Sequence, residues 1–273
     1  MTRRSLFTAT IVFALATSVA LAADFEATFD KTLTVSGAPT VSISTGAGTI
    51  HVTAGTDNQV HIVGHVRSRD GDDSAVKQIA AAPPIAQSDN TITIGASQGN
   101  SDLYRHVSID YDVTTPRSTV LTARSGSGDV GVAGLAGALS ANSGSGSLHL
   151  TVTGTADVKA QTGSGSINLD GVAAGLRAGT GSGSIEVIGS PNADWTLRTG
   201  SGNIHLKVGN NARFTLDAST GSGSVHVDQP MATQGSANRH HVSGTVNGGG
   251  SAIRAATGSG DVIINGASTV SQR

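Results

Sequence analysis

Cysteine is absent from this 273-residue sequence, which excludes disulfide bonds and a lipid-modified N-terminal cysteine. Aromatic residues make up only 3% of the chain, and charged residues only 13%, about half the usual share of ~25%. A core without aromatic side chains must be thin and filled by small aliphatic ones. The composition therefore favours stacked β-strands over a globular α/β core.

The N-terminus has the features of a secretory signal peptide. Arg3 and Arg4 precede an apolar run over residues 6–21, and Ala20-Leu21-Ala22 forms a small-x-small cleavage site. The apolar run is too short to span a membrane. We predict that residues 1–22 are a signal peptide and that the mature protein is exported.

Glycine is abundant, with 37 residues, and much of it belongs to an internal repeat whose commonest form is Thr-Gly-Ser-Gly-Ser-Ile-x-Val. From Gly126 to Gly221 the first glycines of successive copies are 18, 19, 18, 19 and 21 residues apart. The next step, to Gly258, is 37 residues and predicts one degenerate coil in between. The copies begin at Thr45, Ser125, Ser143, Thr162, Thr180, Thr199, Thr220 and Thr257.

Apolar and polar residues alternate on both sides of these glycines, which is typical of strands with one buried face. One copy, for example, has Leu176 and Ala178 before its first glycine and Ile185 and Val187 after it. A single coil cannot bury its apolar face, but a stack of coils can. The pattern predicts an all-β, single-stranded β-solenoid (β-helix) of 18–19-residue coils. The Thr or Ser before each first glycine points inward, so its hydroxyl should satisfy backbone groups at the corner.

Two segments depart from the repeat. Residues 72–81 are poor in β-branched side chains and end before Pro83-Pro84, which predicts a short helix near the N-terminal end. We predict that residues 228–241 form a loop within the degenerate coil. We therefore divide the mature chain into diverged solenoid coils over residues 23–117 and a regular solenoid over residues 118–273.

Several segments of the chain occur in a specific order, and together they cover almost all of the mature sequence. They are the block Phe25–Val66, the run Val107–Val113 leading into Pro116, the repeats from Ser125, the stretch Val242–Gly250 and the closing copy Thr257–Ile264. This order resembles the DUF4097 family, whose members are β-strand repeat proteins labelled as adhesins. The resemblance implies a β-solenoid fold and a place in the cell envelope, but no established biochemical activity.

The residue after each Gly-Ser-Gly is a candidate calcium ligand, because the nine-residue repeats of calcium-binding rolls also give about 18 residues per coil. Only Asp129 and Asp261 are acidic at this position. Ca²⁺ takes about six to eight oxygen ligands, several of them from carboxylates. We expect instead a polar residue that caps the corner.

Histidine recurs at one outward position, in His51, His149, His205 and His226. We call each repeat of the stack a rung. If the repeats stack in chain order, Glu186, His205 and His226 lie on three successive rungs, close enough to share a transition metal. Open strands supply no outer partners to orient the imidazoles, as ligating histidines usually require. We favour a solvated polar row and expect no resident metal or cofactor, although the three residues stay a metal-binding alternative.

The sequence contains no catalytic or nucleotide-binding motif in the structural context that such a motif requires. Gly126–Gly131 fits G-x-G-x-x-G, but it leads into a strand and so lacks the helix N-terminus that binds phosphate. The glycines and serines never give the G-x-S-x-G elbow of hydrolases. The only glutamates are Glu26 and Glu186, which is few for an acid–base site. We expect no catalytic residue and a protein that is not an enzyme.

Sugar binding has two candidate features. Trp195, the only tryptophan, could stack on a sugar ring, but its column otherwise holds Leu, Val and Ile, so we expect it to fill the core. Outward basic residues form a broken face, which could meet an anionic polysaccharide or serve as a solvated face that resists aggregation. The regular Thr/Ser column points inward, which excludes the flat outward threonine array needed to bind ice. The basic residues are Arg124, Lys159, Arg177, Arg198 and Arg254.

These observations favour an exported, non-catalytic solenoid with a binding or structural role in the cell envelope, such as adhesion, in the periplasm or at the cell surface. Its partner would be a protein or polysaccharide of the envelope. Without Arg3 and Arg4 the chain has fifteen basic and nineteen acidic residues, which excludes a generic nucleic-acid surface. The alternatives are a carbohydrate-active β-helix enzyme and an accessory protein in envelope-stress sensing.

Overall fold

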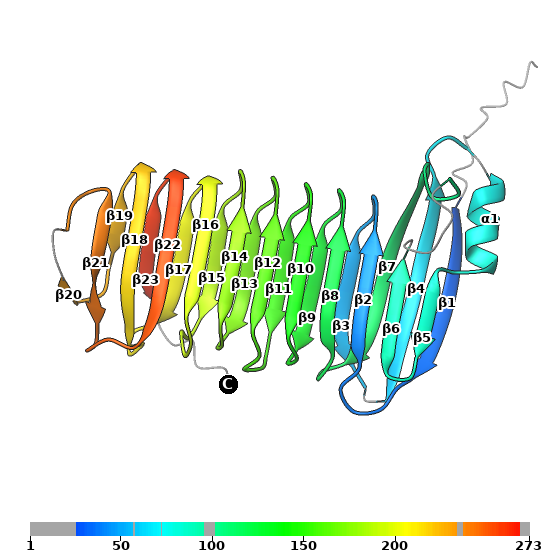
Figure 1. Cartoon of the computed structure of the whole chain (residues 1–273), viewed down its shortest axis with the longest axis horizontal. Helices are drawn as coiled ribbons and strands as arrows, with labels where there is room; N and C mark the ends of the chain where they lie inside the picture. The colour runs from blue at the N-terminus through cyan, green and yellow to red at the C-terminus, as the bar shows by residue number, and fades with distance from the viewer. Residues whose placement is uncertain (1–25, 57, 72, 96–101, 234–236, 268–273) are drawn as a thin grey trace, which may run out of the picture.

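The computed structural model describes residues 26–56, 58–71, 73–95, 102–233 and 237–267, so the predicted signal peptide lies outside the described part. The described chain is an elongated, all-β rod with one helix (Figure 1). Two sheets run along its length: an 11-stranded sheet, here called sheet A, and a 12-stranded sheet, here called sheet B. The all-β, solenoid-like architecture expected from the repeat is confirmed.

Each repeat contributes one strand to sheet B and the next strand to sheet A, and neighbouring repeats pair in parallel. In sheet B these strands are β8 (Val120–Ser125), β10 (Leu139–Ser143), β12 (Val158–Thr162), β14 (Leu176–Thr180), β16 (Trp195–Ser201), β18 (Phe214–Ser222) and β22 (Ser251–Ser259). In sheet A they are β9 (Val130–Leu135), β11 (Leu148–Val152), β13 (Ile167–Val172), β15 (Ile185–Gly189), β17 (Ile204–Gly209), β19 (Val225–Val227) and β23 (Val262–Ala267).

The N-terminal end combines coil-like strands with an antiparallel cap. β2 (Thr40–Thr45) and β3 (Ile50–Gly55) stack directly on β8 and β9, although a long segment of chain separates them. β6 (Thr91–Gly95) and β7 (Val107–Pro116) stack in parallel on their other side. The remaining strands of this end pair antiparallel: β1 (Glu26–Thr34) with β4 (Gln59–Ser68), β4 with β7, and β5 (Ile85–Ser88) with β6.

The predicted helix is confirmed as α1 (Asp73–Ala81), while residue 72 lies outside the described residues. Ala75, Val76 and Ile79 form its buried face, which packs against β1 and β4. Asp73 in the first turn is favourable at the positive end of the helix dipole. The helix therefore belongs to the N-terminal cap and covers the end of the stack.

The C-terminal end corrects the expectation of a single-stranded solenoid whose coils stack in chain order. The last repeat, β22 and β23, lies between β16/β17 and β18/β19, with parallel pairing on both sides. The segment expected to be a degenerate coil instead adds β21 (His241–Val246) antiparallel to β18, and β20 (Met231–Thr233) antiparallel to β21. Residues 228–241 are therefore not simply a loop, and both sheets are mixed. Because all repeats carry similar apolar columns, their pattern does not specify which repeats become neighbours.

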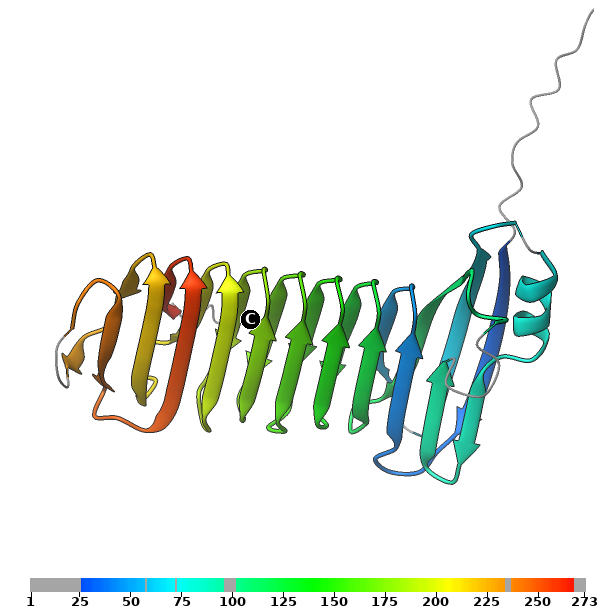
Figure 2. The same cartoon turned by 45° about the horizontal axis from the view of Figure 1, so that its top comes forward.

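The inward columns fill the core, and hydroxyl groups close the corners, as the sequence predicts. Ile185, Val187 and Leu176 are buried. Thr180 Oγ1 donates to Gly165 O of the neighbouring rung at 2.8 Å and accepts from Gly183 N at 3.1 Å. Equivalent pairs of bonds are made by Ser125, Ser143 and Thr162. Figure 2 shows the corner turns in one row along the rod, between the two sheets.

Candidate functional site

The acidic residues after Gly-Ser-Gly cap the corners of the neighbouring rungs. Asp129 Oδ1 accepts from Ser147 N at 2.7 Å, and Asp261 Oδ1 accepts from Ser224 N at 2.8 Å, each across to the neighbouring rung. The hydrogen bonds that Ser224 N and Ser224 Oγ donate to Asp261 hold the pKa of this carboxyl below its usual value. β11, β13, β15 and β17 separate the rungs of the two aspartates, so they cannot share an ion. The expected capping role is confirmed.

The histidine row does not bring the suggested metal ligands together. Ile263 of β23 pairs with His205 on one side and with His226 on the other. Glu186 and His205 are neighbours, but His226 lies one rung further away than chain order suggested. Within the described residues, no group of three or more His, Asp or Glu side chains could hold a metal ion. The prediction of three successive rungs is wrong because the last repeat inserts between the two preceding ones.

Glu186 is engaged instead by a lysine of the next strand. Lys207 Nζ donates to Glu186 Oε1 at 2.6 Å. This hydrogen bond, together with the charges of Lys207 and His205, holds the pKa of Glu186 below its usual value and outweighs a smaller opposing effect of burial. Glu186 is therefore kept as a charged carboxylate on the outer face of sheet A.

Replacing Lys207 with Met should raise the pKa of Glu186. Because this pKa is lowered in the folded protein, the ion pair contributes stability above the unfolded-state pKa, and that contribution disappears as the pH falls through the folded-state pKa. The variant should lack this part of the acid sensitivity. A carboxyl-detected NMR titration measures it, with Glu26, the only other glutamate, as a reference resonance. An unchanged titration of Glu186 would show that the pair does not form in solution.

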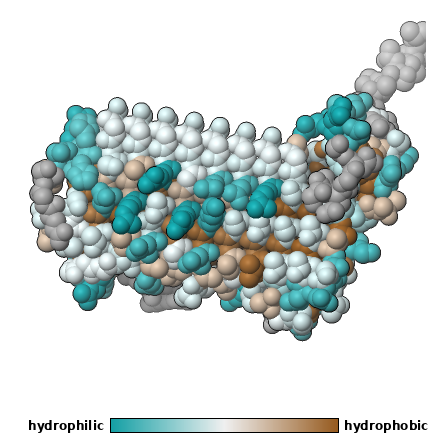
Figure 3. Space-filling model, in the orientation of Figure 1, coloured by the Kyte–Doolittle hydropathy of each residue, from teal (hydrophilic) through white to brown (hydrophobic). Residues whose placement is uncertain are grey.

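The outer face of sheet B carries the predicted basic residues. All five point outward and are exposed: Arg124, Lys159, Arg177, Arg198 and Arg254. Lys159 and Arg177 are direct neighbours on β12 and β14. Figure 3 shows this face, with hydrophilic side chains (teal) lying beside a strip of hydrophobic ones (brown) that crosses the strands. The predicted basic face is therefore present, and it borders a hydrophobic strip.

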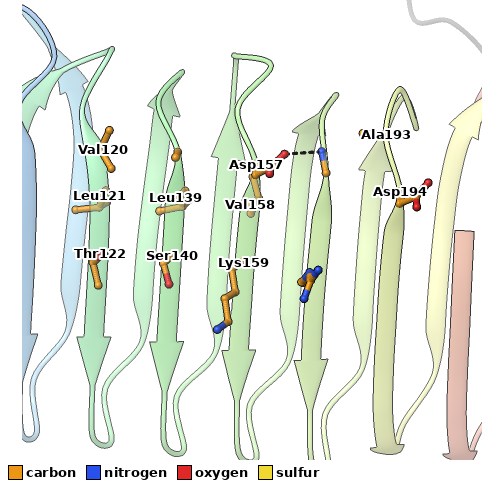
Figure 4. A pocket seen from close by; sticks show the side chains of 13 residues that line it. Val120, Leu121, Thr122, Leu139, Ser140, Asp157, Val158, Lys159, Ala193 and Asp194 are labelled. Atoms are coloured by element: carbon orange, nitrogen blue, oxygen red, sulfur yellow. Dashed lines mark hydrogen bonds between the residues drawn. The ribbon is translucent and has the colours of Figure 1, made fainter. Parts of the chain in front are cut away.

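A hollow of about 600 Å³ lies in this strip, where the strands from β8 to β14 begin (Figure 4). Leu121, Leu139 and Val158 form its floor, and Lys159 and Arg177 stand at its edge. We call it the apolar hollow. It exists because the outward residues beside the floor include Ala138 and Gly175, which are too small to cover it. The sequence analysis missed this hollow, although the small residues Ala138 and Gly175 in an outward column were the available signal.

A second hollow of about 520 Å³ lies nearer the other ends of the same strands. It is lined by amide and hydroxyl side chains, including Asn142 and Gln161, and by Arg198. Gly179 opens it, because this outward position carries no side chain. We call it the polar hollow. Along the strands, Lys159 and Arg177 stand between the two hollows.

The acidic residues beside the apolar hollow are already bound to the backbone. Asp157 Oδ1 accepts from Gly175 N at 3.0 Å, shown as a dashed line in Figure 4, and Asp194 Oδ1 accepts from Ala252 N at 2.9 Å. Each carboxylate thus caps the start of the neighbouring strand. Within the part of the chain that the structure describes, none of the five basic side chains of this face forms an ion pair.

Trp195 lies in the core behind this face and is fully buried. Its Nε1 donates to Ala174 O at 2.8 Å, and its neighbours in the column are Leu176 and Ile253. The expected core-filling role is confirmed. Trp195 therefore offers no surface on which a sugar ring could stack.

A comparison with protein families gives a match to the model described as Toastrack DUF4097, over residues 39–174 and 84–265. The chain belongs to the DUF4097 family. The family match begins after β1 and covers the repeats and the basic face of sheet B, so this face is part of the DUF4097 region. No curated protein matches the chain. No helix in the described ranges is both long and apolar enough to cross a membrane.

Solved structures that match this DUF4097 protein share little sequence with it. A candidate cell adhesion protein from Clostridium sporogenes is 12% identical, with a TM-score of 0.41, over 87% of this chain and 99% of the other. A candidate adhesin from Parabacteroides merdae is 16% identical, with a TM-score of 0.35, over 87% and 96%. A candidate lipid-binding protein from Parabacteroides distasonis is 11% identical, with a TM-score of 0.30, over 87% and 96%.

Proposed function

We propose that this DUF4097 protein is an exported, non-catalytic binding module of the cell envelope, with adhesion as its role, and that its ligand lies on the outer face of sheet B. The observation that carries the proposal is the apolar hollow, bordered by Lys159 and Arg177, neither of which forms an ion pair with a described acidic residue. Concave sites with an apolar floor and a few polar groups are the usual form of ligand sites.

The separate structural roles of the repeat residues support a binding role for the outer face. The inward columns fill the core, the glycines and the Thr/Ser hydroxyls form the corners, and the residues after Gly-Ser-Gly cap the next rung. Only the outward positions differ freely in chemistry from rung to rung. A rigid rod that presents such a face suits recognition of an extended envelope molecule.

The alternative, a carbohydrate-active enzyme, would need an acid and a base beside a sugar site. Asp157 and Asp194 are the carboxylates that line the apolar hollow. Both accept hydrogen bonds from backbone N–H groups near the start of neighbouring strands, which explains their presence without catalysis. Turnover of any member of a polysaccharide panel, abolished by Asp157→Asn or Asp194→Asn in a folded protein, would overturn the non-catalytic proposal.

Cell fractionation with a C-terminal epitope tag tests the placement. We expect an exported protein whose mature N-terminus is Ala23, measured by mass spectrometry, and whose tag is removed by protease added to intact cells. The prediction rests on the signal features of residues 1–22. Retention in the cytoplasm would contradict export. Protection from protease in intact cells, together with release from the periplasm, would contradict adhesion and leave a periplasmic binding role.

A further inference from the structure

Three cations lie on neighbouring strands of the outer face of sheet B, and two of them are directly paired. Lys159 and Arg177 are paired positions on β12 and β14, and Arg198 lies on the adjacent strand β16. Like charges side by side on neighbouring strands are unfavourable. No described acidic side chain forms an ion pair with any of them, although the whole chain carries a net charge of −2. Asp157 and Asp194 also line the apolar hollow, but each carboxylate accepts a hydrogen bond from a backbone N–H group. Three cations without ion pairs on an acidic protein point to an anionic ligand.

Hydroxyl and amide side chains surround these cations. Thr122 and Ser140 line the apolar hollow beside Lys159, and Asn142 and Gln161 line the polar hollow beside Arg198. Hydroxyl and amide groups both donate and accept hydrogen bonds, as sugar hydroxyls require of their partners. The cations supply the complementary group for an anion, and Arg in particular binds carboxylates through two parallel hydrogen bonds. Charge and hydrogen bonding together match a sugar chain with acidic groups.

Other anionic partners fit the face less well. A lipid bilayer would call for protruding apolar side chains, but Leu121, Leu139 and Val158 are recessed and buried, and Val120, at 40%, is the only large hydrophobic residue that is exposed among the described ones. Single-stranded nucleic acid is usually held by exposed aromatic side chains, and Trp195 is buried. A polymer of hydroxylated, charged units needs neither feature.

We propose that Lys159, Arg177 and Arg198 bind the acidic groups of a polysaccharide that lies across the strands of sheet B from β8 to β16. This inference rests on the proposed function and names the ligand class of the same face. The two hollows extend in this direction, and four inter-strand spacings give the bound segment a length of about 19 Å. The sugar chain lies in the hollows and its acidic groups face the cations.

Calorimetry with the mature protein and oligogalacturonate, a chain of carboxylated sugars, tests the proposal. We expect binding that weakens as salt is added. The double substitution Lys159→Glu/Arg177→Glu should reduce the affinity by about tenfold or more, because each charge-assisted hydrogen bond is lost. Lys159→Gln/Arg177→Gln should act in the same direction without creating new charge. The glutamine variant should be at least as thermally stable as the parent, because it removes the repulsion between the paired positions, and this separates a ligand role from a structural one.

The matched control is Lys31→Glu/Arg69→Glu, which reverses two exposed cations at the N-terminal end of the chain. We expect it to leave oligogalacturonate binding unchanged. Equal loss of binding in this control would show a response to net charge alone and would overturn the proposal. So would equally tight binding of inorganic polyphosphate, or binding of phosphatidylglycerol vesicles in place of oligogalacturonate. An exported protein that binds no acidic sugar would refute this inference alone, whereas a cytoplasmic protein would refute the proposed function.

Discussion

Substituting alanine for Gly163 should lower the free energy of unfolding by about 3 kcal/mol or more. A Cβ atom at this corner would lie 2.3 Å from Gly144 O of the neighbouring rung. The obstacle is backbone, so no side-chain rotation can relieve the contact, and the two rungs would have to separate. Because each rung is stabilised through its neighbours, a local separation weakens the stack on both sides. Guanidinium denaturation followed by the fluorescence of Trp195 measures the loss.

Gly46 provides the matched control, since it is the first glycine of its own repeat and a Cβ there would meet nothing within 4 Å. Gly46→Ala should therefore change the stability by less than about 0.5 kcal/mol, as for surface substitutions in general. If both variants were equally destabilised, the loss would come from backbone conformation and not from the packing of rungs. If neither were destabilised, the close approach of Gly163 to Gly144 O on the neighbouring rung would be contradicted.

Replacing Trp195 with alanine should cost about 3–5 kcal/mol, the usual range for removing a buried aromatic side chain. Trp195 is fully buried between Leu176 and Ile253, and its removal also leaves Ala174 O without its donor. Because the variant lacks the fluorescent reporter, far-UV circular dichroism during thermal and guanidinium unfolding is the appropriate measurement.

Trp195→Phe separates packing from hydrogen bonding. It keeps most of the volume but loses the indole N–H, so we expect a smaller loss of about 1–2 kcal/mol. Because the side chain lies behind the binding face and not on it, Trp195→Phe should leave oligogalacturonate affinity unchanged. Loss of sugar binding at unchanged stability would contradict the buried position and restore a stacking role.

Part of the candidate site could be predicted from the outward-facing residues of the sequence, and part could not. Alternation alone places Lys159, Arg177 and Arg198 on one outer face, and the structure confirms it. The hollows form because Ala138, Gly175 and Gly179 lie among longer side chains of neighbouring strands. Which side chains become neighbours is determined only by the stacking of the strands. The pairing of Glu186 with Lys207 likewise requires two residues of adjacent strands to be offset along their length.

The sequence by itself determined the strands, the inward columns such as Ile185 and Val187, the corner role of Thr180 and the helix of the N-terminal cap. These features follow from local alternation, turn chemistry and the prolines after the helix, none of which depends on distant residues. Only the tertiary structure decided the order of the rungs, in which β22 and β23 insert before β18 and β19 and so place Ile263 between His205 and His226. The physical reason is that the inward columns of the repeats are nearly equivalent, so several stacking orders bury similar apolar surface. In the stacking order that the chain adopts, β18 lies at the end of the parallel strands of sheet B, and β21 and β20 pair antiparallel beyond it.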